Sequence, residues 1–244
     1  MPGRDGGGAV YPRDDMDKYK KLLADAGRVL AHEGQGDYVA GHVSLRHPDD
    51  PSLFLMKPAG IGLEEMTDEN IITVDIEGNK VAGGSGRHNE VFIHSEVLRA
   101  RPECQAVVHT HAIYAVVFSS LGKQLQAVSN DGAFFANGLP VFDETTELII
   151  TQARGKAVAR KLADKGALLL RNHGIVTTAT TMEEAVWLAL KLNQACQHQM
   201  MAEWAGGPKL VGDPEQAKVK GAYAARPDIF TGIFNYVLRR SGGS

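Results

Sequence analysis

The sequence has few of the features that mark secreted, membrane-spanning or nucleic-acid-binding proteins. Its 244 residues include only two cysteines, Cys104 and Cys196, too few for a disulfide framework. No basic segment followed by an apolar one opens the chain, and no apolar run is long enough to span a membrane. A formal net charge of −3 also supplies no broad basic surface for nucleic acid or anionic lipid. These absences predict a cytoplasmic protein with reduced thiols and a small-molecule partner.

The composition that remains is typical of a globular protein. Hydrophobic residues make up 43% and charged residues 23% of the chain, and this length is enough for one full core. The opening stretch MPGRDGGGAVYP and the closing SGGS are rich in glycine and proline or serine. We therefore expect a flexible leader over residues 1–13, one domain over 14–240 and a flexible tail over 241–244.

Hydrophobic periodicity predicts an alternation of helices and strands. Apolar residues recur at helical spacing over residues 15–32, and four short β-like runs follow, HVSL, LFLM, IITVD and NKVAG. Further helices are expected over 90–101, 112–121, 145–165, 182–204 and 228–238, strands over 105–109 and 167–171, and a loop over 206–214. The pattern indicates an α/β protein in which helices cover a central sheet.

Three histidines stand at the ends of two apolar runs. His109 and His111 close the run AVVHTH, and His173 follows another, LLLRNHG. In a strand, residues two apart project to the same side, so the first two imidazoles can act together. Three imidazoles form a metal site that leaves a coordination position open to water or substrate. The chain is therefore expected to be an enzyme that binds a divalent metal ion.

Several motifs together resemble the class II aldolase/adducin family. They are GHVSLR at 41–46, MKPAGI at 56–61, Glu90 at the start of a helix that ends in ARP, then AVVHTH and LRNHG. The resemblance implies a three-layer α/β/α sandwich around a mostly antiparallel sheet, assembled as a homotetramer with sites between subunits. It also implies that His109, His111 and His173 bind the metal and that Glu90 is the catalytic acid/base. A carboxylate near a metal can shuttle a proton between substrate and solvent.

Some positions depart from the family members that cleave sugar phosphates. Where those members have small polar groups for the phosphate, this sequence has Gly41-His42, Ala59-Gly60 and His88-Asn89. The change leaves fewer compact donors for a phosphate and adds groups able to grip a carboxylate. We expect a phosphate-free, carboxylate substrate, bound by residues from these motifs and the segment before Glu90: His42, Ser44, Lys57, Gly60, Arg87 and Asn89. For Arg87 and Lys57, a solvated loop charge is the alternative interpretation.

A second departure concerns a tyrosine that aldolase members place after the histidine pair. The comparable stretch, SNDGAFFANGLPVF, contains Phe134 and Phe135 and no tyrosine. Neither phenylalanine can donate a proton. Both are either core residues or an aromatic wall beside the site, which would suit a flat ring.

These departures favour a metal-dependent lyase that removes CO₂ from a hydroxylated aromatic or hydroxypyridine dicarboxylate, with a dihydroxyphthalate-like compound as the specific hypothesis. Glu90 or His88 would deliver the proton to the ring carbon. One alternative is an aldolase or epimerase that acts on an unphosphorylated hydroxyketone or sugar-like substrate. A second is a non-catalytic, adducin-like interaction module, which the retained histidines and Glu90 argue against.

The sequence determines neither the identity of the metal nor which residues reach a neighbouring subunit. Zinc, manganese and iron all accept a site of three histidines, so the metal is undetermined. In a tetramer, Tyr223, Arg226 or Tyr236 near the carboxyl end would be able to reach the site of a neighbouring subunit.

Overall fold

An eight-stranded sheet forms the centre of the computed structural model, which describes residues 16–208 and 211–242 of the chain. The expected leader, residues 1–13, and the last two residues of the expected tail lie outside this described part. The strands are β1 His42–Arg46, β2 Leu53–Met56, β3 Ile72–Asp75, β4 Lys80–Ala82, β5 Ala106–Thr110, β6 Val141–Phe142, β7 Ala167–Leu170 and β8 Gly174–Ala179. Their spatial order is β4-β3-β2-β1-β5-β8-β7-β6. Every neighbouring pair is antiparallel except β6 and β7, so the sheet is mostly antiparallel, as the family resemblance implied.

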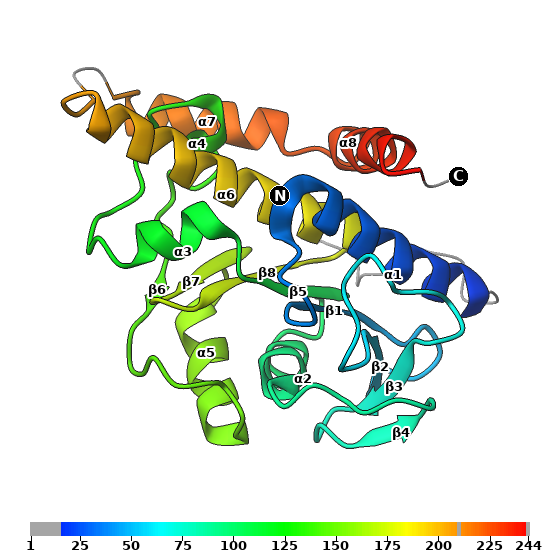
Figure 1. Ribbon diagram of the computed structural model, residues 1–244. Coiled ribbons are helices and arrows are strands. Elements are labelled where there is room, and N and C mark those ends of the chain that lie inside the picture. The colour runs from blue at the N-terminus through cyan, green and yellow to red at the C-terminus, as the bar shows by residue number, and fades with distance from the viewer. Residues whose placement is uncertain (1–15, 209–210, 243–244) are drawn as a thin grey trace, which may run out of the picture.

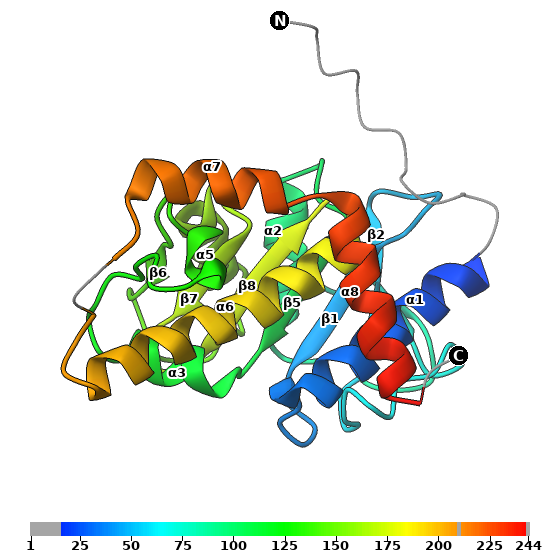
Figure 2. The ribbon, with the colours of Figure 1, turned by 90° about the horizontal axis from the view of Figure 1, so that it is seen from above.

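Helices cover both faces of this sheet and make the molecule three-layered (Figure 1). The helical elements are α1 Met16–Leu30, a π-helical turn η1 Ala31–Gln35, α2 Val91–Ala100, α3 Ile113–Ser119, α4 Asn130–Ala133, α5 Gln152–Leu162, α6 Met182–Trp204, α7 Pro214–Ala224 and α8 Pro227–Arg240. Helices α2 and α5 lie side by side on one face, and α1, α6 and α8 lie over the other (Figure 2). The expected α/β/α sandwich is confirmed.

Strand alternation divides the core into two layers and places the polar residues of the site. On β1, Val43 and Leu45 belong to the apolar cluster beneath α1 and α6. His42 and Ser44 point to the opposite face, where they contact His94 of α2. On β5, Val107 belongs to the cluster beneath α2 and α5, so His109, two residues later, projects to that face as well. The histidines therefore gather between the sheet and α2.

The structure corrects one of the expected elements and adds others that the sequence analysis did not include, among them β6, α4, β8 and α7. The helix expected over 145–165 begins only at Gln152, because the Thr151 hydroxyl accepts from the backbone N–H of Arg154 and caps the helix there. The strand β8 was not anticipated, and neither was α7, which begins where the Asp213 carboxylate accepts from the N–H of Gln216. Among the helices of the described residues, none is long and apolar enough to cross a membrane.

Candidate metal centre and active site

The three predicted ligand histidines meet at one end of the central strands. His109 is the fourth residue of β5, and His111 follows one residue after that strand ends. His173 lies in the tight turn between β7 and β8, the strand that pairs with β5. The ring centroids are 5.2 Å apart for His109 and His111, 5.0 Å for His109 and His173, and 5.2 Å for His111 and His173. The geometry is that of a cluster and not of separate core histidines.

The turn that carries His173 is held by unusual backbone geometry. Asn172 has a positive φ of 57°, a conformation that asparagine tolerates better than most residues. Its backbone N–H donates to the hydroxyl of Ser119 at 2.9 Å, which ties the turn to α3. Gly174 follows, and its missing side chain lets the backbone of Thr110 and the rings of His109 and His111 approach closely. The turn therefore brings His173 directly against the histidine pair.

Hydrogen bonds orient two of the rings so that their Nε2 atoms face the same point. Nδ1 of His109 lies 2.9 Å from the carbonyl oxygen of Ile175, to which only a protonated nitrogen can donate. Nδ1 of His111 lies 2.8 Å from the carboxylate of Asp37, an arrangement that fixes the ring of a metal ligand. The Nε2 atoms of His109, His111 and His173 are all buried and make no hydrogen bond within the described residues. Three converging nitrogen atoms without partners fit a bound metal ion.

Glu90 completes the cluster from the amino-terminal end of α2. Its Oε2 lies 3.4 Å from Nε2 of His173 and 3.9 Å from Nε2 of His109, and its Oε1 accepts from the N–H of Ile149 at 2.8 Å. Burial raises the pKa of this carboxyl, but the close approach of His173 and the charges of His109 and His173 outweigh burial and lower the pKa to about 2.

The donor set suits a divalent ion. One ligand atom from each of Glu90, His109, His111 and His173 lies within 4.8 Å of every other. Imidazole nitrogen and carboxylate oxygen are ligands for zinc, manganese and iron, and three histidines leave room for substrate or water. The cluster could therefore hold one divalent metal ion, and its identity is not fixed by the ligands.

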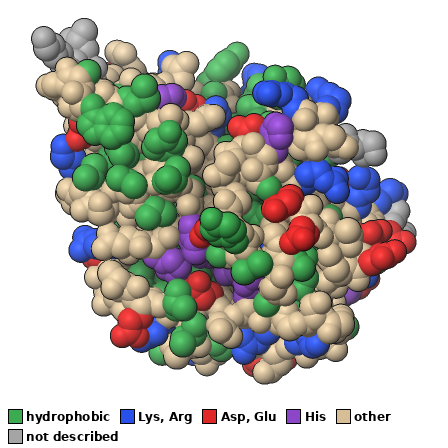
Figure 3. Space-filling view, viewed as in Figure 1, with side chains coloured by type: hydrophobic (Ala, Val, Ile, Leu, Met, Phe, Trp, Pro, Cys, Tyr) green, Lys and Arg blue, Asp and Glu red, His purple; other side chains and the backbone are tan. Residues whose placement is uncertain are grey.

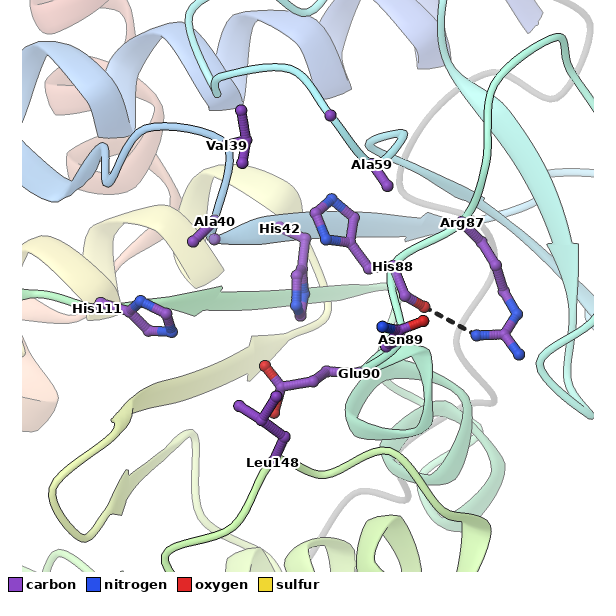
Figure 4. Close-up of a pocket in the computed structure, with 12 residues that line it drawn as sticks. Val39, Ala40, His42, Ala59, Arg87, His88, Asn89, Glu90, His111 and Leu148 are labelled. Carbon is purple, nitrogen blue, oxygen red and sulfur yellow. Dashed lines mark hydrogen bonds between the residues drawn. The ribbon is translucent and has the colours of Figure 1, made fainter.

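A cavity of about 470 Å³ adjoins this cluster (Figure 4). It is lined by residues from the η1–β1 segment, the β2–β3 loop, the segment before α2 and the β6–α5 loop: Val39, Ala40, Gly41, His42, Ala59, Gly60, Arg87, His88, Asn89, Glu90, His111 and Leu148. In Figure 4 the His42 ring and the Glu90 carboxylate point into the same space, with His111 on one side and Arg87 on the other. Figure 3 shows apolar side chains around a group of histidines that is visible at the surface. Two exposed apolar side chains, Val39 and Leu148, belong to the cavity lining.

Several predicted substrate-binding residues line this cavity. His42, Gly60, Arg87, His88 and Asn89 all contribute to its wall. The guanidinium of Arg87 donates one hydrogen bond to the carbonyl oxygen of His88 at 2.9 Å, which braces it at the cavity edge. Burial and the nearby Lys57 lower the pKa of His88 to about 4, although hydrogen bonding to Pro58 and the charge of Glu90 act in the opposite direction. His88 therefore presents a neutral imidazole at neutral pH.

Two of the predicted contacts lie behind the cavity wall. Lys57 is fully buried, and its ammonium group donates to the carbonyl oxygens of Val39 at 3.1 Å and Pro58 at 3.3 Å. These bonds hold the Lys57 amine against backbone and not at the cavity surface, and burial lowers its pKa to about 8. Ser44 is also fully buried and contacts His94. Both residues support the wall and do not reach the cavity within this chain.

Phe134 and Phe135 also lie away from the cavity of their own chain. The ring of Phe134 packs edge-on against Trp187 of α6, with centroids 4.5 Å apart. Phe135 is 6% exposed and belongs to the core cluster beneath α1 and α6. The core interpretation therefore describes both rings, and no aromatic wall forms at the cavity within one chain.

Sequence reasoning missed three contributors to the site. His94 lies one helical turn after Glu90 on α2, so its spacing alone would have placed it on the same face. Asp37 and the segment carrying Leu148 and Ile149 come from irregular loops, and no sequence pattern connects them with the histidines. The first could have been found from the sequence, and the other two required the folded chain.

Comparisons with known proteins identify the family of this chain. The family model of the class II aldolase and adducin N-terminal domain matches residues 21–200. Decarboxylase NovR of Streptomyces niveus is 32% identical over 187 residues, 76% of this chain and 69% of that protein. The 3,4-dihydroxyphthalate decarboxylase of Arthrobacter keyseri is 31% identical over 201 residues, 77% of this chain and 80% of that protein.

A solved structure extends the similarity to almost the whole chain. The L-fuculose 1-phosphate aldolase from Glaciozyma antarctica PI12 superposes with a TM-score of 0.83 at 29% identity, covering 97% of this chain and 95% of that one. From the extent of the family match, the relatives and the shared fold, the chain belongs to the class II aldolase and adducin family.

Proposed function

We propose that this protein is a metal-dependent carboxy-lyase that removes CO₂ from a hydroxylated aromatic or hydroxypyridine dicarboxylate. The observation that carries this proposal is the combination of the Glu90 and three-histidine cluster with a cavity whose other polar groups include Arg87, His88 and His42. These groups suit a carboxylate better than a phosphate, which needs several compact donors. Two relatives whose names describe them as decarboxylases support the same direction.

His109, His111 and His173 are the residues proposed to hold the metal, which would be zinc, manganese or iron, and Glu90 lies beside them. When bound, a divalent ion would draw electron density from a substrate hydroxyl oxygen and so favour the buildup of negative charge on the ring. Arg87 is proposed to bind one carboxylate with two N–H groups, and His42 to donate to a second oxygen; both residues line the cavity.

Side chains of the protein are then proposed to carry the proton that the ring carbon needs. The ring carbon that bears the departing carboxylate takes a proton, which interrupts the aromatic system while the ring hydroxyl oxygen supplies electron density. The bond from that carbon to the carboxylate then breaks, its electron pair returns to the ring and restores aromaticity, and CO₂ leaves. Glu90 is the proposed carrier of this proton, with His88 as the second candidate, because both side chains line the cavity.

A second candidate function is an aldolase or epimerase that acts on an unphosphorylated hydroxyketone. The overall similarity to an L-fuculose 1-phosphate aldolase favours it, since the same ligand set supports cleavage next to a carbonyl group. A non-catalytic, adducin-like role is disfavoured by the complete cluster of Glu90 and three histidines.

The proposal includes an assembly of several chains. Apolar side chains exposed at the cavity, Val39 and Leu148, would be covered by a second copy, as expected for a homotetramer. In that assembly Tyr223, Arg226 or Tyr236 would approach a neighbouring site. Cys104 and Cys196 are buried and free, which suits the proposed cytoplasmic location.

The test is a substrate screen with metal-loaded protein. CO₂ release is measured with 3,4-dihydroxyphthalate and with hydroxypyridine dicarboxylates, beside aldehyde release from hydroxyketones. Glu90→Gln should lower kcat by about 10²–10⁴-fold. Glu69→Gln, an exposed carboxylate remote from the cavity lining, serves as the matched control. Aldehyde release without any CO₂ from the dicarboxylates would reject the carboxy-lyase in favour of the aldolase.

A further inference from the structure

A second group of polar side chains is buried directly behind the cavity, apart from Glu90 and the three proposed metal ligands. Nδ1 of His42 lies 2.6 Å from Nε2 of His94, and Nδ1 of His94 lies 2.6 Å from the hydroxyl oxygen of Ser44. The three residues are 2%, 0% and 0% exposed, so water cannot replace any of these contacts. His42 alone also reaches the cavity. The three side chains form a line of hydrogen bonds that ends at the substrate space.

The hydroxyl hydrogen of Ser44 determines which atom donates and which accepts in these hydrogen bonds. Within the described residues, the Ser44 hydroxyl has a single hydrogen-bond partner, Nδ1 of His94. If His94 donated to Ser44, the hydroxyl hydrogen would be buried without an acceptor, at a cost of about 1–3 kcal/mol. The favoured arrangement therefore has Ser44 donating its hydrogen to Nδ1 of His94.

The same reasoning determines which nitrogen atom carries the proton in the rings of His94 and His42. Nδ1 of His94 accepts from Ser44, so this nitrogen carries no hydrogen, and the single N–H of the ring is on Nε2, which donates to Nδ1 of His42. Because Nδ1 of His42 accepts, the hydrogen of that ring is on Nε2. That Nε2 makes no hydrogen bond within the described residues and is free for a ligand.

We infer that His94 is a positioning residue which, with Ser44, holds His42 in the Nε2–H tautomer, so that His42 presents a fixed N–H donor to an anionic oxygen of the substrate. The identity of that oxygen as a carboxylate or ring oxyanion rests on the proposed function, whereas the tautomer itself does not. A fixed donor favours a substrate that offers a hydrogen-bond acceptor at this point and disfavours one that offers a donor.

The same tautomer also keeps Nε2 of His42 from binding the metal. The His42 ring centroid lies only 4.8 Å from that of His109, close to the cluster of Glu90 and the three proposed ligands. A nitrogen that carries hydrogen has no lone pair for a metal ion. Fixing the proton on Nε2 therefore keeps His42 as a substrate contact.

The tautomer can be measured without any substrate. Protein labelled with ¹⁵N-histidine is studied by NMR in its metal-free and zinc-loaded forms, and His42 is assigned from the loss of its signals in His42→Gln. In the unaltered protein we expect a single Nε2–H signal pattern for His42. In Ser44→Ala no hydroxyl hydrogen fixes which nitrogen of His94 accepts, so we expect His42 to show a mixture of both tautomers. His94→Phe should give the same mixture.

Ser95→Ala provides the matched control, because Ser95 is a buried serine next to His94, and the Ser95 hydroxyl has no hydrogen-bond partner among the residues that the structure describes. It should leave the His42 signals unchanged. An Nδ1–H pattern in the unaltered protein, or an unchanged Nε2–H pattern in Ser44→Ala, would overturn the inference. Because no turnover is involved, either result is distinct from a failure of the carboxy-lyase proposal.

Ligand binding gives an independent measure with 3,4-dihydroxybenzoate as the probe. Its affinity for zinc-loaded protein should fall by about 3–10-fold in Ser44→Ala, since a donor fixed in place becomes only partly populated. Zinc affinity and the affinity for 3,4-dihydroxybenzoate should both stay unchanged in Ser95→Ala. Equal affinity of Ser44→Ala and the unaltered protein for the probe would contradict the role assigned to His42.

Discussion

Replacing Gly174 by alanine should weaken metal binding strongly, although none of the proposed ligand residues is changed. A Cβ atom at this position would lie 2.6 Å from the carbonyl oxygen of Thr110, where ordinary contact begins at 3.4 Å, so the two must separate by about 0.8 Å. The same atom would lie 3.0 Å from the His111 ring and 3.1 Å from the His109 ring. The backbone and both ligand rings therefore have to move together.

The expected magnitude follows from how closely metals constrain their ligands. Metal–ligand distances tolerate about 0.2 Å, so a displacement several times larger separates the nitrogen atoms from a common point. We expect zinc affinity to fall by at least about 10–100-fold, the range seen when the support of a metal ligand is removed. The added methyl group should also destabilise the metal-free protein by about 1–3 kcal/mol, as overpacking does.

The assay is competition for zinc against a chromophoric chelator, together with thermal unfolding in zinc and in chelator. Gly232→Ala in α8 is the matched control, because a Cβ there meets nothing within 4 Å. It should bind zinc normally and be more stable by about 0.5–1 kcal/mol. Normal zinc affinity in Gly174→Ala would refute the argument that this glycine allows the ligands to converge.

Three further predictions follow from single contacts. Asp37→Asn should weaken zinc binding by about 10–100-fold in the same competition assay, whereas exposed Asp68→Asn should not, since Asp37 orients the ring of a ligand. Arg46→Met should lower the free energy of unfolding in urea by at least about 3 kcal/mol, because the buried guanidinium donates to four backbone carbonyl groups; an unchanged midpoint would contradict this. Because burial lowers the pKa of His88 to about 4 and of His94 to about 3, the unfolded chain binds more protons between pH 6.5 and these values, and the stability of the metal-free protein should fall as pH falls through that range. His94→Phe should reduce the slope by about 1.4 kcal/mol per pH unit, and an unaltered slope would show that His94 is not buried in its neutral form.

The meeting of His109 and His111 was predictable because strand alternation, a local rule, puts both side chains on one side. The antiparallel pairing of β5 with β8 brings the turn with His173 to the same edge, but β8 was not anticipated, so the sequence placed His173 only at the end of a second strand. The position of Glu90 at the start of α2 was read from the helix pattern and the family motifs, and α2 packs against β5. Strand and helix periodicity act over a few residues, so the sequence expresses them directly.

The contacts around the ligands were not predictable in this way. Asp37 and His111 are 74 residues apart, and their bond depends on how an irregular loop returns to β5. Lys57 was expected as a possible carboxylate clamp, yet its amine turns inward because two backbone carbonyl oxygens accept from it there. A charged side chain beside a strand end has the same sequence pattern whether it faces solvent or caps buried carbonyl groups, so composition alone cannot separate the two.

The spacing of Glu90 and His94 in the sequence is enough to predict that both side chains lie on the same face of one helix. Residues four apart on a helix lie on one face, so any helix that presents Glu90 to the cavity also presents His94 to the same face of the sheet. Strand alternation places His42 and Ser44 on the sheet face toward α2, two residues apart. Two periodicities, 3.6 on the helix and 2 on the strand, thus suffice to predict that these side chains meet. The direction of their hydrogen bonds requires one further fact, the burial of the Ser44 hydroxyl with a single partner, and only the folded chain supplies it.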